Sequence, residues 1–492
     1  MRVRLRKIIS IIIAIALLSL PVYALGNAPP KCEFDGYIVK FKDDFTLPAP
    51  MSEGESLFCP LEASDNTYTA AAISEVQPYI DYGVVDYVEP NYYMDLFEAP
   101  NDPGYTGAKQ RYLDSLRLPY AWTKNIQTKN VRVCIIDSGV NKNHVDFAGL
   151  DLTKGENFLD NSKNFEDDIG HGTFITSVIA AATNNKIGMA GIAPGVEIVT
   201  MKCFSAGNKG TYADIIEAIN LAVLPPEKGG FGCNIINMSF GSPQSSTALE
   251  TAIKKAYDAG AILVAAVGND YSAALRYPAA YAEVIGVGAV TNTMEKADFS
   301  NFNASVKVVA PGVNIIGASN TSNDGYKSDR GTSYSVPIVV GIAALAKSVK
   351  PQLTPQEFMD LLEETSTDLG APGRDDSFGN GFLNAELILR CLGEDFGVFA
   401  EEANNKINIY GCISTQTFGE ACSVLTASYD ADGRMGDVGI IKGKTKPDGR
   451  LILPVQATGI AASRKVSIYV LNSNSAPMFN KTTYLPGKTV PN

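Results

Sequence analysis

The chain has 492 residues, of which 45% are hydrophobic and 19% charged, and its formal net charge at pH 7 is −12. A chain of this length is expected to form roughly two to four folded units, and its hydrophobic content is sufficient for large buried cores. The acidic balance argues against nucleic-acid binding and against membrane attachment through clustered Lys and Arg, because both need local positive charge.

The first 24 residues have the three-part layout of a secretory signal peptide. The basic segment MRVRLRK precedes the apolar run IISIIIAIALLSL, and Val22 and Ala24 stand where small residues mark a cleavage site. The apolar run is short for a membrane span, which favours a cleaved signal over an uncleaved anchor. We therefore expect cleavage after Ala24, no membrane span after signal removal, and a secreted, extracellular protein that is free or associated with the cell surface.

Residues 25–98 have the pattern of a small α+β unit. The strand pattern GYIVKFK comes first, a helical middle follows, and VVDYVEPNYYMDLF ends the region with further strands. Neither an internal repeat nor a long low-complexity linker is evident along the chain.

Strand and helix patterns alternate between residues 131 and 349. The strand patterns are short, β-branched and almost continuously apolar: VRVCIID, EIVTMKCF, NIINMSF, AILVAAVG and EVIGVGAV. Helix patterns lie between them: TFITSVIAAAT, YADIIEAINLAV and STALETAIKKAYDAG. Such alternation predicts an α/β fold, with a parallel sheet covered by helices on both faces. Active sites in such folds form at the carboxyl ends of the strands.

The pattern changes after about residue 395. Alternating runs such as KINIYGCIS, GRLILPVQA and RKVSIYVLN replace the helical periodicity. We expect residues 396–492 to form a β-rich accessory domain of the β-sandwich type.

The eight cysteines match no zinc-binding spacing. Cys134 lies in an apolar strand and is expected to be a small buried hydrophobic residue. In an oxidising medium Cys412 could pair with Cys422, and Cys32 with Cys59, but spacing alone leaves the connectivity open.

Four polar residues stand where a parallel sheet would gather them. Asp137 follows the strand VRVCII, and Asn269 follows AILVAAVG. His171 starts a helix within GHGT, and Ser333 lies at the mouth of the long apolar helix in GTSYSVPIVVGIAALA. Each residue alone has an ordinary explanation, as a turn residue or a helix cap.

Together the four residues predict nucleophilic catalysis. A serine hydroxyl becomes a good nucleophile when a histidine takes its proton, and that imidazole needs a carboxylate to fix its tautomer. The Asn269 amide and the backbone N–H of Ser333 would stabilise the developing oxyanion. The sequence therefore favours Asp137, His171 and Ser333 as a catalytic group.

At these stretches the chain resembles the subtilisin family of serine proteases (subtilases). The matching segments span roughly residues 99–393 and are IIDSG, GHGT, INMSFG, VGN, YPAAYAEVIGVGAV, ADFSNF, VAPGVNI and GTSYSVP. The resemblance implies a seven-stranded-type parallel sheet in a catalytic domain of residues 99–395. It also implies a serine endopeptidase that acts through an acyl-enzyme on protein or peptide substrates.

The sequence departs from the family pattern near the site. Ile175 stands where the family usually has a second histidine, and Tyr334, Ser335 and Val336 replace methionine, alanine and serine after the nucleophile. The other histidine, His144, is expected to be structural. These departures put the packing around the catalytic residues in doubt rather than the residues themselves.

Residues 25–98 resemble the inhibitory propeptide of the family. The resemblance implies a self-processed precursor, a zymogen whose own propeptide acts as an intramolecular inhibitor. The self-cut would fall near Phe97, Glu98 or Ala99. Because Arg276 stands where the family lines its S1 pocket, we hypothesise cleavage after Glu98 and acceptance of acidic P1 residues.

The resemblance also implies how substrate and metal bind. A substrate strand would pair with backbone edges, and the substrate-binding residues would be Ser239, Phe240, Gly241, Ser242 and Gly210, with Arg276 in the S1 pocket. A structural calcium ion would be held by oxygen atoms, contributed by Asp102, Asp146, Thr183, Asn185, Ile187 and Met189. Alternatively, Asp102 and Asp146 only cap turns.

Two other functions compete with a secreted endopeptidase. One is a non-catalytic surface protein that uses the same fold for binding, and the other is a processing protease with a single dedicated partner. The sequence leaves open the physiological substrate and the role of the C-terminal domain, which could bind the cell surface, bind substrate or only stabilise the protein.

Overall fold

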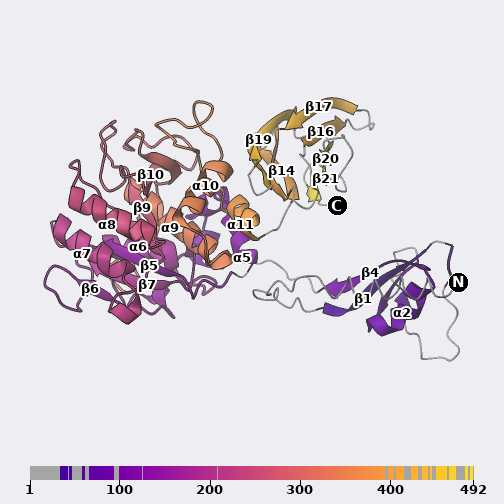
Figure 1. Ribbon diagram of the computed structural model, residues 1–492, viewed down its shortest axis with the longest axis horizontal. Coiled ribbons are helices and arrows are strands. Elements are labelled where there is room, and N and C mark those ends of the chain that lie inside the picture. Colours follow the sequence, from indigo (N-terminus) through magenta and orange to yellow (C-terminus); the bar gives the residue numbers. More distant parts are fainter. Residues whose placement is uncertain are drawn as a thin grey trace, which may run out of the picture. The chain divides into compact units, whose positions relative to one another are not determined.

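The computed structural model describes residues 34–42, 44–46, 58–60, 66–92, 99–124, 126–207 and 209–393, and the C-terminal strands between 397 and 490 (Figure 1). The expected signal peptide, the expected self-cleavage site at Phe97 or Glu98, and the cysteines Cys32 and Cys422 lie outside the described residues. The chain separates into two compact units, Met1–Phe97 and Glu98–Asn492.

The first unit is an α+β fold, as predicted. Its sheet has the order β2-β3-β1-β4, with antiparallel pairing throughout. The elements are β1 (Phe34–Phe41), β2 (Phe58–Pro60), β3 (Thr67–Ala70), α2 (Ile73–Asp81) and β4 (Val85–Tyr92). Helix α2 begins with a capping box in which the Glu75 carboxylate accepts the backbone N–H of Ala72. Aromatic packing around the buried Phe41 ring forms the core.

The second unit is built on a seven-stranded parallel sheet with the order β11-β10-β9-β8-β5-β7-β6. Its strands are β5 (Arg132–Asp137), β6 (Gly155–Asn157), β7 (Glu197–Lys202), β8 (Ile235–Met238), β9 (Ile262–Ala266), β10 (Val284–Val290) and β11 (Val306–Pro311). The α/β fold is therefore confirmed. The apolar runs in the sequence predicted the five inner strands of this sheet. They did not predict its two edge strands, β6 and β11.

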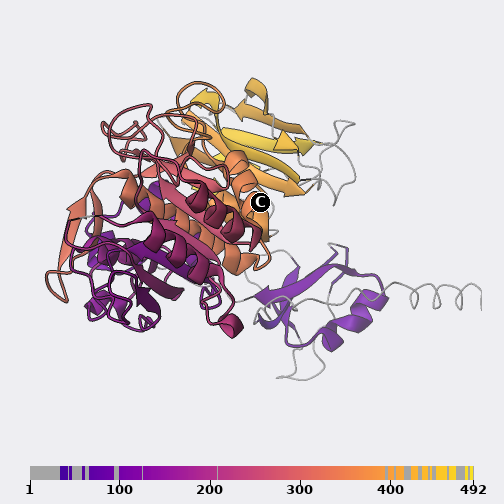
Figure 2. The same ribbon diagram turned by 60° about the vertical axis from the view of Figure 1, so that its left-hand side comes forward.

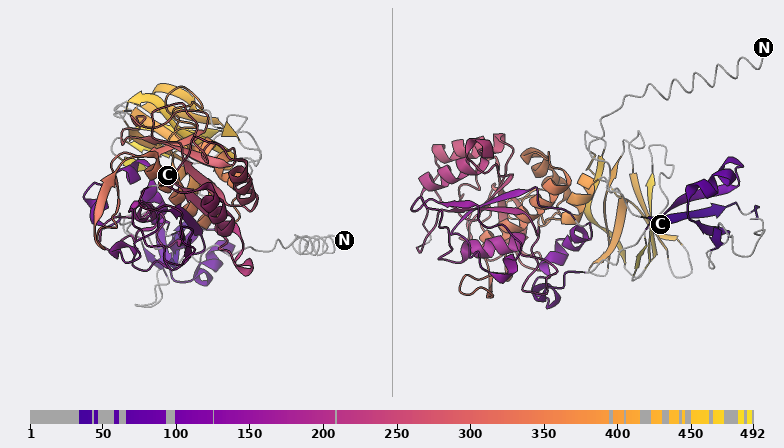
Figure 3. Two further views of the ribbon diagram at one scale, coloured as in Figure 1. Left: turned by 90° about the vertical axis from the view of Figure 1, so that its left-hand side faces the viewer. Right: turned by 90° about the horizontal axis from the view of Figure 1, so that it is seen from below.

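Four helices cover the sheet, and they are α6 (His171–Ala180), α7 (Tyr212–Val223), α8 (Thr247–Asp258) and α9 (Thr332–Val349). Helix α6 packs on α9, and α7 packs on α8, so the two pairs cover its two faces (Figures 2 and 3). Helix α6 starts two residues before the predicted TFITSVIAAAT segment and ends at Ala180, where the chain enters the loop that contains Asn185.

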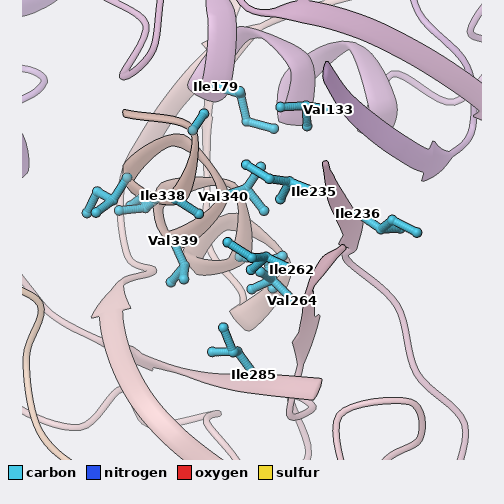
Figure 4. Close-up of a cluster of buried hydrophobic side chains, with 14 of the residues drawn as sticks. Val133, Ile179, Ile235, Ile236, Ile262, Val264, Ile285, Ile338, Val339 and Val340 are labelled. Carbon is cyan, nitrogen blue, oxygen red and sulfur yellow. The ribbon is translucent and has the colours of Figure 1, made fainter. Parts of the chain in front are cut away.

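Helix α9 forms the centre of the core. It contacts α6 and the strands β8, β9, β10 and β11. Figure 4 shows Ile338, Val339 and Val340 of this helix beside Ile262 and Val264 of β9. Within the part of the chain that the structure describes, α9 alone is long and apolar enough to cross a membrane, but 83% of it is buried inside the fold. It is a core helix, and it carries Ser333 at its start.

Smaller elements complete this unit. They are α3 (Pro103–Thr106), α4 (Tyr112–Ser115), α5 (Leu118–Thr123), η1 (Val145–Phe147), η2 (Pro226–Lys228), α10 (Pro355–Thr365), α11 (Ala385–Gly393) and the antiparallel pair β12 (Ile315–Ala318) and β13 (Tyr326–Asp329). Cys134 in β5 is fully buried, as predicted.

The C-terminal strands form two antiparallel sheets, β14-β15-β19-β18 and β17-β16-β20-β21-β22, in agreement with the predicted sandwich class. The bounds are β14 (Gly397–Ala403), β15 (Lys406–Ser414), β16 (Ser423–Tyr429), β17 (Met435–Ile441), β18 (Lys444–Thr445), β19 (Arg450–Ala461), β20 (Lys465–Leu471), β21 (Thr482–Leu485) and β22 (Lys488–Val490). Tyr410 of β15 ties the first sheet to the helices: its ring lies under the Arg117 guanidinium and its hydroxyl donates to Glu386 Oε2 (3.0 Å).

Candidate active site

The carboxyl ends of β5, β8 and β9 bring the candidate residues together. Asp137 is the last residue of β5, and His171 is the first residue of α6. The imidazole Nδ1 lies 2.8 Å from Asp137 Oδ1 and 2.9 Å from Oδ2. Because a carboxylate on Nδ1 holds the proton there, Nε2 is left as the basic nitrogen.

The electrostatic surroundings of His171 favour its charged form. Burial lowers the pKa of His171, but the charge and hydrogen bond of Asp137 outweigh it, with a further contribution from Asp167. Lys327, across the pocket, opposes this effect. The pKa of His171 therefore lies above its ordinary value of 6.5.

Ser333 is joined to the end of β8 by two reciprocal hydrogen bonds. The Ser333 hydroxyl donates to the Ser239 carbonyl (2.8 Å), and the Ser239 hydroxyl donates to the Ser333 carbonyl (2.9 Å). Among the described residues, Ser333 Oγ has no hydrogen bond to His171. The hydroxyl must turn from the Ser239 carbonyl toward the imidazole before proton transfer, and loose catalytic hydrogen bonds are common in unliganded sites.

Two candidate hydrogen-bond donors belong to Ser333 itself and to Asn269, which is bonded to the preceding residue, Thr332. The Asn269 side-chain oxygen accepts both the backbone N–H (2.8 Å) and the hydroxyl (2.9 Å) of Thr332, which fixes the amide and leaves Nδ2 without a partner among the described residues. The Ser333 N–H lies in the first turn of α9, where backbone donors have no partner within the helix. The geometry thus suits an oxyanion site.

The carboxylate of Asp167 organises the start of α6. This buried side chain accepts the hydroxyl of Ser138 (2.8 Å), the backbone N–H of Gly170 (2.8 Å), and both the N–H (2.8 Å) and the hydroxyl (2.6 Å) of Thr173. The sequence reasoning missed Asp167. Its position in the sequence could have indicated this role, because aspartates are often found just before a helix, where their negative charge interacts favourably with the helix N-terminus.

A buried lysine, Lys202, also stabilises the turn after β5. Lys202 Nζ donates to the carbonyls of Ser138 (2.7 Å) and Glu166 (3.0 Å) and pairs with Asp168. Gly172 lets the two segments approach, since a Cβ there would collide with the Gly139 carbonyl oxygen.

The departures from the family pattern lie around the site. Ile175 is fully buried in α6 and contributes to the core. The Tyr334 ring lies 5.6 Å from the His171 ring and 4.4 Å from the Phe174 ring, centroid to centroid, and its hydroxyl donates to Asp329 (2.8 Å). His144 lies elsewhere, where its Nε2 is 2.9 Å from the Gly325 carbonyl.

A pocket of about 350 Å³ opens at the site. Asp137, Ser138, Ile169, His171, Phe204, Ser239, Phe240, Lys327 and Tyr334 line it. The rings of Phe204 and Phe240 lie 5.1 Å apart and make one wall apolar. Gly210 stands close to this wall, because a Cβ there would contact the Phe204 ring at 3.0 Å. Ser242 forms backbone hydrogen bonds with Tyr277, which precedes the cis-proline Pro278.

Arg276 packs against the backbone at Gly241 and Gly268, but its charge is paired. A Cβ at Gly268 would meet Arg276 Cγ at 2.8 Å, and one at Gly241 would meet Arg276 Cβ at 3.2 Å, so the stem packs between these glycines. The guanidinium Nε and Nη2 both donate to Asp270 Oδ2 (2.9 and 2.5 Å). The sequence reasoning missed Asp270 as the partner.

The residues implied for calcium also come together. Asp102 is fully buried and accepts the backbone N–H groups of Asn184 (2.9 Å) and Asn185 (3.3 Å). Asp146 is fully buried and accepts the Asn185 side-chain amide (3.0 Å) and the Met189 N–H (2.9 Å). The described residues contain no cluster of three or more His, Cys, Asp or Glu side chains that could hold a metal.

Comparison with known proteins agrees with this geometry. The sequence profile of the subtilase family matches residues 128–381. The chain is 34% identical over 278 residues to subtilisin BL of Lederbergia lenta, covering 56% of this chain and 97% of that protein. It is 37% identical over 269 residues to a thermophilic serine proteinase of Bacillus sp. (strain AK1), covering 54% of this chain and 64% of that protein.

A solved structure shows the same likeness. A protease from Pseudoalteromonas arctica PAMC 21717 superposes with a TM-score of 0.53 and 27% sequence identity, covering 60% of this chain and all of that chain. The chain therefore belongs to the subtilase family and is a subtilisin-like serine endopeptidase.

Proposed function

We propose that Asp137, His171 and Ser333 form the catalytic triad of a secreted endopeptidase that is self-processed from a precursor. The observation that carries the proposal is the paired contact of the Asp137 carboxylate with His171 Nδ1. Ser333 stands at the start of α9 beside the fixed amide of Asn269.

The reaction follows from the roles of these groups. His171 Nε2 takes the Ser333 proton as Oγ attacks the peptide carbonyl, and then delivers it to the leaving amine, which forms an acyl-enzyme. Water, activated by the same imidazole, attacks the acyl-enzyme and releases Ser333. The Asn269 Nδ2 and the Ser333 N–H stabilise the oxyanion of each tetrahedral intermediate.

The precursor has four proposed parts: the signal peptide 1–24, the inhibitory propeptide 25–98, the catalytic domain 99–395 and the β-rich accessory domain 396–492. Export of the precursor is inferred from its N-terminus, which has the layout of a signal peptide. The propeptide is inferred from the α+β unit that ends before the catalytic domain begins. The C-terminal domain stabilises the helices that it contacts through Tyr410.

Protein or peptide substrates are proposed to bind along Ser239, Phe240, Gly241 and Ser242 and beside Gly210. Arg276 lies at the S1 position, and Asp270 competes for its guanidinium. An acidic P1 residue would have to displace Asp270. The competition reduces the preference for acidic P1 residues without removing it.

We also propose that a structural calcium ion binds at the loop that follows α6. Asp102 and Asp146 are two fully buried carboxylates, and no Lys or Arg forms an ion pair with either among the described residues. The backbone carbonyls of Thr183, Ile187 and Met189 accept no hydrogen bond within the described chain. The Asn185 amide donates to Asp146, and its oxygen accepts the Ile187 N–H (2.7 Å), so Asn185 would join the ion only by giving up these bonds. The carboxylate and carbonyl oxygens are hard donors of the kind that suits Ca²⁺. The ion would neutralise the carboxylates and fix the loop.

Replacement of the nucleophile tests the function. We expect the wild-type chain to yield a shortened mature protein, whereas Ser333→Ala accumulates as an uncut precursor because no acyl-enzyme forms. Gel analysis and N-terminal sequencing of both proteins provide the measurement. Identical banding of the two would refute self-processing and favour the binding scaffold.

The pH dependence tests the role of Asp137. Catalysis needs neutral His171, so activity falls as pH drops through the raised pKa of His171. We expect Asp137→Asn to lower kcat by about 10⁴ and to move the acid limb to lower pH, because the carboxylate that raises this pKa is gone. Exposed Asp160→Asn is the matched control, and an unshifted limb in Asp137→Asn would contradict the assignment.

Specificity tests the Arg276–Asp270 pair. We expect Asp270→Asn to raise the ratio of kcat/KM for P1 glutamate over P1 phenylalanine about tenfold, equivalent to about 1.4 kcal/mol. The reason is that the freed guanidinium can bind the substrate carboxylate. The double variant with Arg276→Ala should lose the gain. An unchanged ratio in Asp270→Asn would exclude Arg276 from the S1 site.

Calcium removal tests the metal proposal. In the Ser333→Ala chain, calcium at 100 times Kd should stabilise the fold by about 2.7 kcal/mol. We expect EGTA to abolish this gain and lower the melting temperature in calorimetry. Asp146→Asn should remove the response to EGTA, whereas exposed Asp151→Asn should keep it. Equal melting with and without EGTA would rule the site out.

A further inference from the structure

A second and larger cavity lies at the amino ends of the strands, away from the catalytic residues at their carboxyl ends. Its volume is about 600 Å³, which is within the range of small-molecule sites. Residues just before β5, β8 and β9 line it together with the last turn of α9 and the segment that follows. They are Gln127, Asn130, Val131, Val223, Pro225, Pro226, Gly232, Cys233, Asn234, Ala259, Gly260, Lys347, Ser348, Pro351, Gln352, Leu353 and Thr354.

Lys347 is the one lysine or arginine among the residues that line this cavity. The residue is only 7% exposed, and its ammonium forms no hydrogen bond or ion pair with any residue that the structure describes. Burial lowers its pKa, while Glu357 opposes this effect from a distance. Glu357 is itself paired with Lys350, at 2.8 Å. Lys347 is therefore an uncompensated buried cation, and such a charge is costly.

The other lining groups add donors and no negative charge. None of the residues that line the cavity is Asp or Glu, although the chain as a whole carries a net charge of −12. The side-chain oxygen of Asn234 accepts the backbone N–H of Arg132 (2.8 Å), so its amide nitrogen is the group left to donate. One ammonium with amide donors matches a singly charged oxyanion.

We propose that this cavity binds a small carboxylate ligand whose oxygens pair with Lys347 and accept from the Asn234 amide. A carboxylate carries one negative charge and neutralises Lys347 without leaving an excess charge in the cavity. Apolar walls formed by Val131, Val223 and Leu353 suit a ligand with an aliphatic body. The site is independent of the triad, because it lies at the opposite end of α9 from Ser333.

Calorimetric titration of the full Ser333→Ala chain tests the proposal. The probes are N-acetyl-alanyl-alanine with a free carboxylate and the same dipeptide as its amide. We expect saturable binding of the acid, at least tenfold weaker binding of the amide, and at least tenfold weaker binding of the acid to a chain that also carries Lys347→Met. Lys350→Met, which removes a neighbouring lysine paired with Glu357, is the matched control and should bind the acid normally.

The same variants distinguish binding at this cavity from binding at the catalytic cleft. If the acid bound at the catalytic cleft, Lys347→Met would leave its affinity unchanged. Equal binding of acid and amide, unchanged binding in Lys347→Met, or no binding of the acid would each overturn the proposal. If Lys347→Met does not fold, acetylation of Lys347 in the Ser333→Ala chain is followed by mass spectrometry. The acid should slow that acetylation several-fold and the amide should not. Equal labelling with both probes would likewise overturn it.

Discussion

The buried carboxylate of Asp167 joins the turn after β5 to the first turn of α6, and the position of His171 depends on this connection. Its oxygens accept donors from Ser138, Gly170 and Thr173, which belong to both segments. A buried anion is tolerated only where hydrogen bonds or charges compensate it. Here the compensation comes from the helix start and from hydroxyls, so the imidazole is held against Asp137 by elements that take no part in the chemistry.

Hydrogen bonds from neighbouring side chains likewise fix the other polar groups at the carboxyl ends of the strands. Lys202 Nζ donates to the carbonyl of the buried Ser138 and to the carbonyl of the exposed Glu166, and so ties the turn after β5 to the segment before α6. The Thr332 donors similarly fix the Asn269 amide. In each case one side chain fixes the orientation of another. This arrangement is the preorganisation that electrostatic stabilisation of an oxyanion requires.

Sequence reasoning predicted the elements whose evidence is local. Continuous apolar runs predicted the inner strands, because both faces of a parallel strand are buried. Asp137, His171, Asn269 and Ser333 were identified because they follow or precede such elements. Partners across space were missed: Asp167 and Asp270 are unremarkable in the sequence, and their roles arise from residues that the fold brings near. The edge strand β6 was missed because its three residues, Gly155–Asn157, carry no apolar pattern.

The burial of α9 has a practical consequence for the expression of fragments. Its 18 residues are apolar enough to enter a bilayer, and the packed strands, together with α6 and α11, keep them from water. A truncated chain that lacks β10 and β11, or ends within α10, would expose this surface and would aggregate or associate with membranes. Soluble fragments of the catalytic unit should therefore keep the whole sheet together with α9.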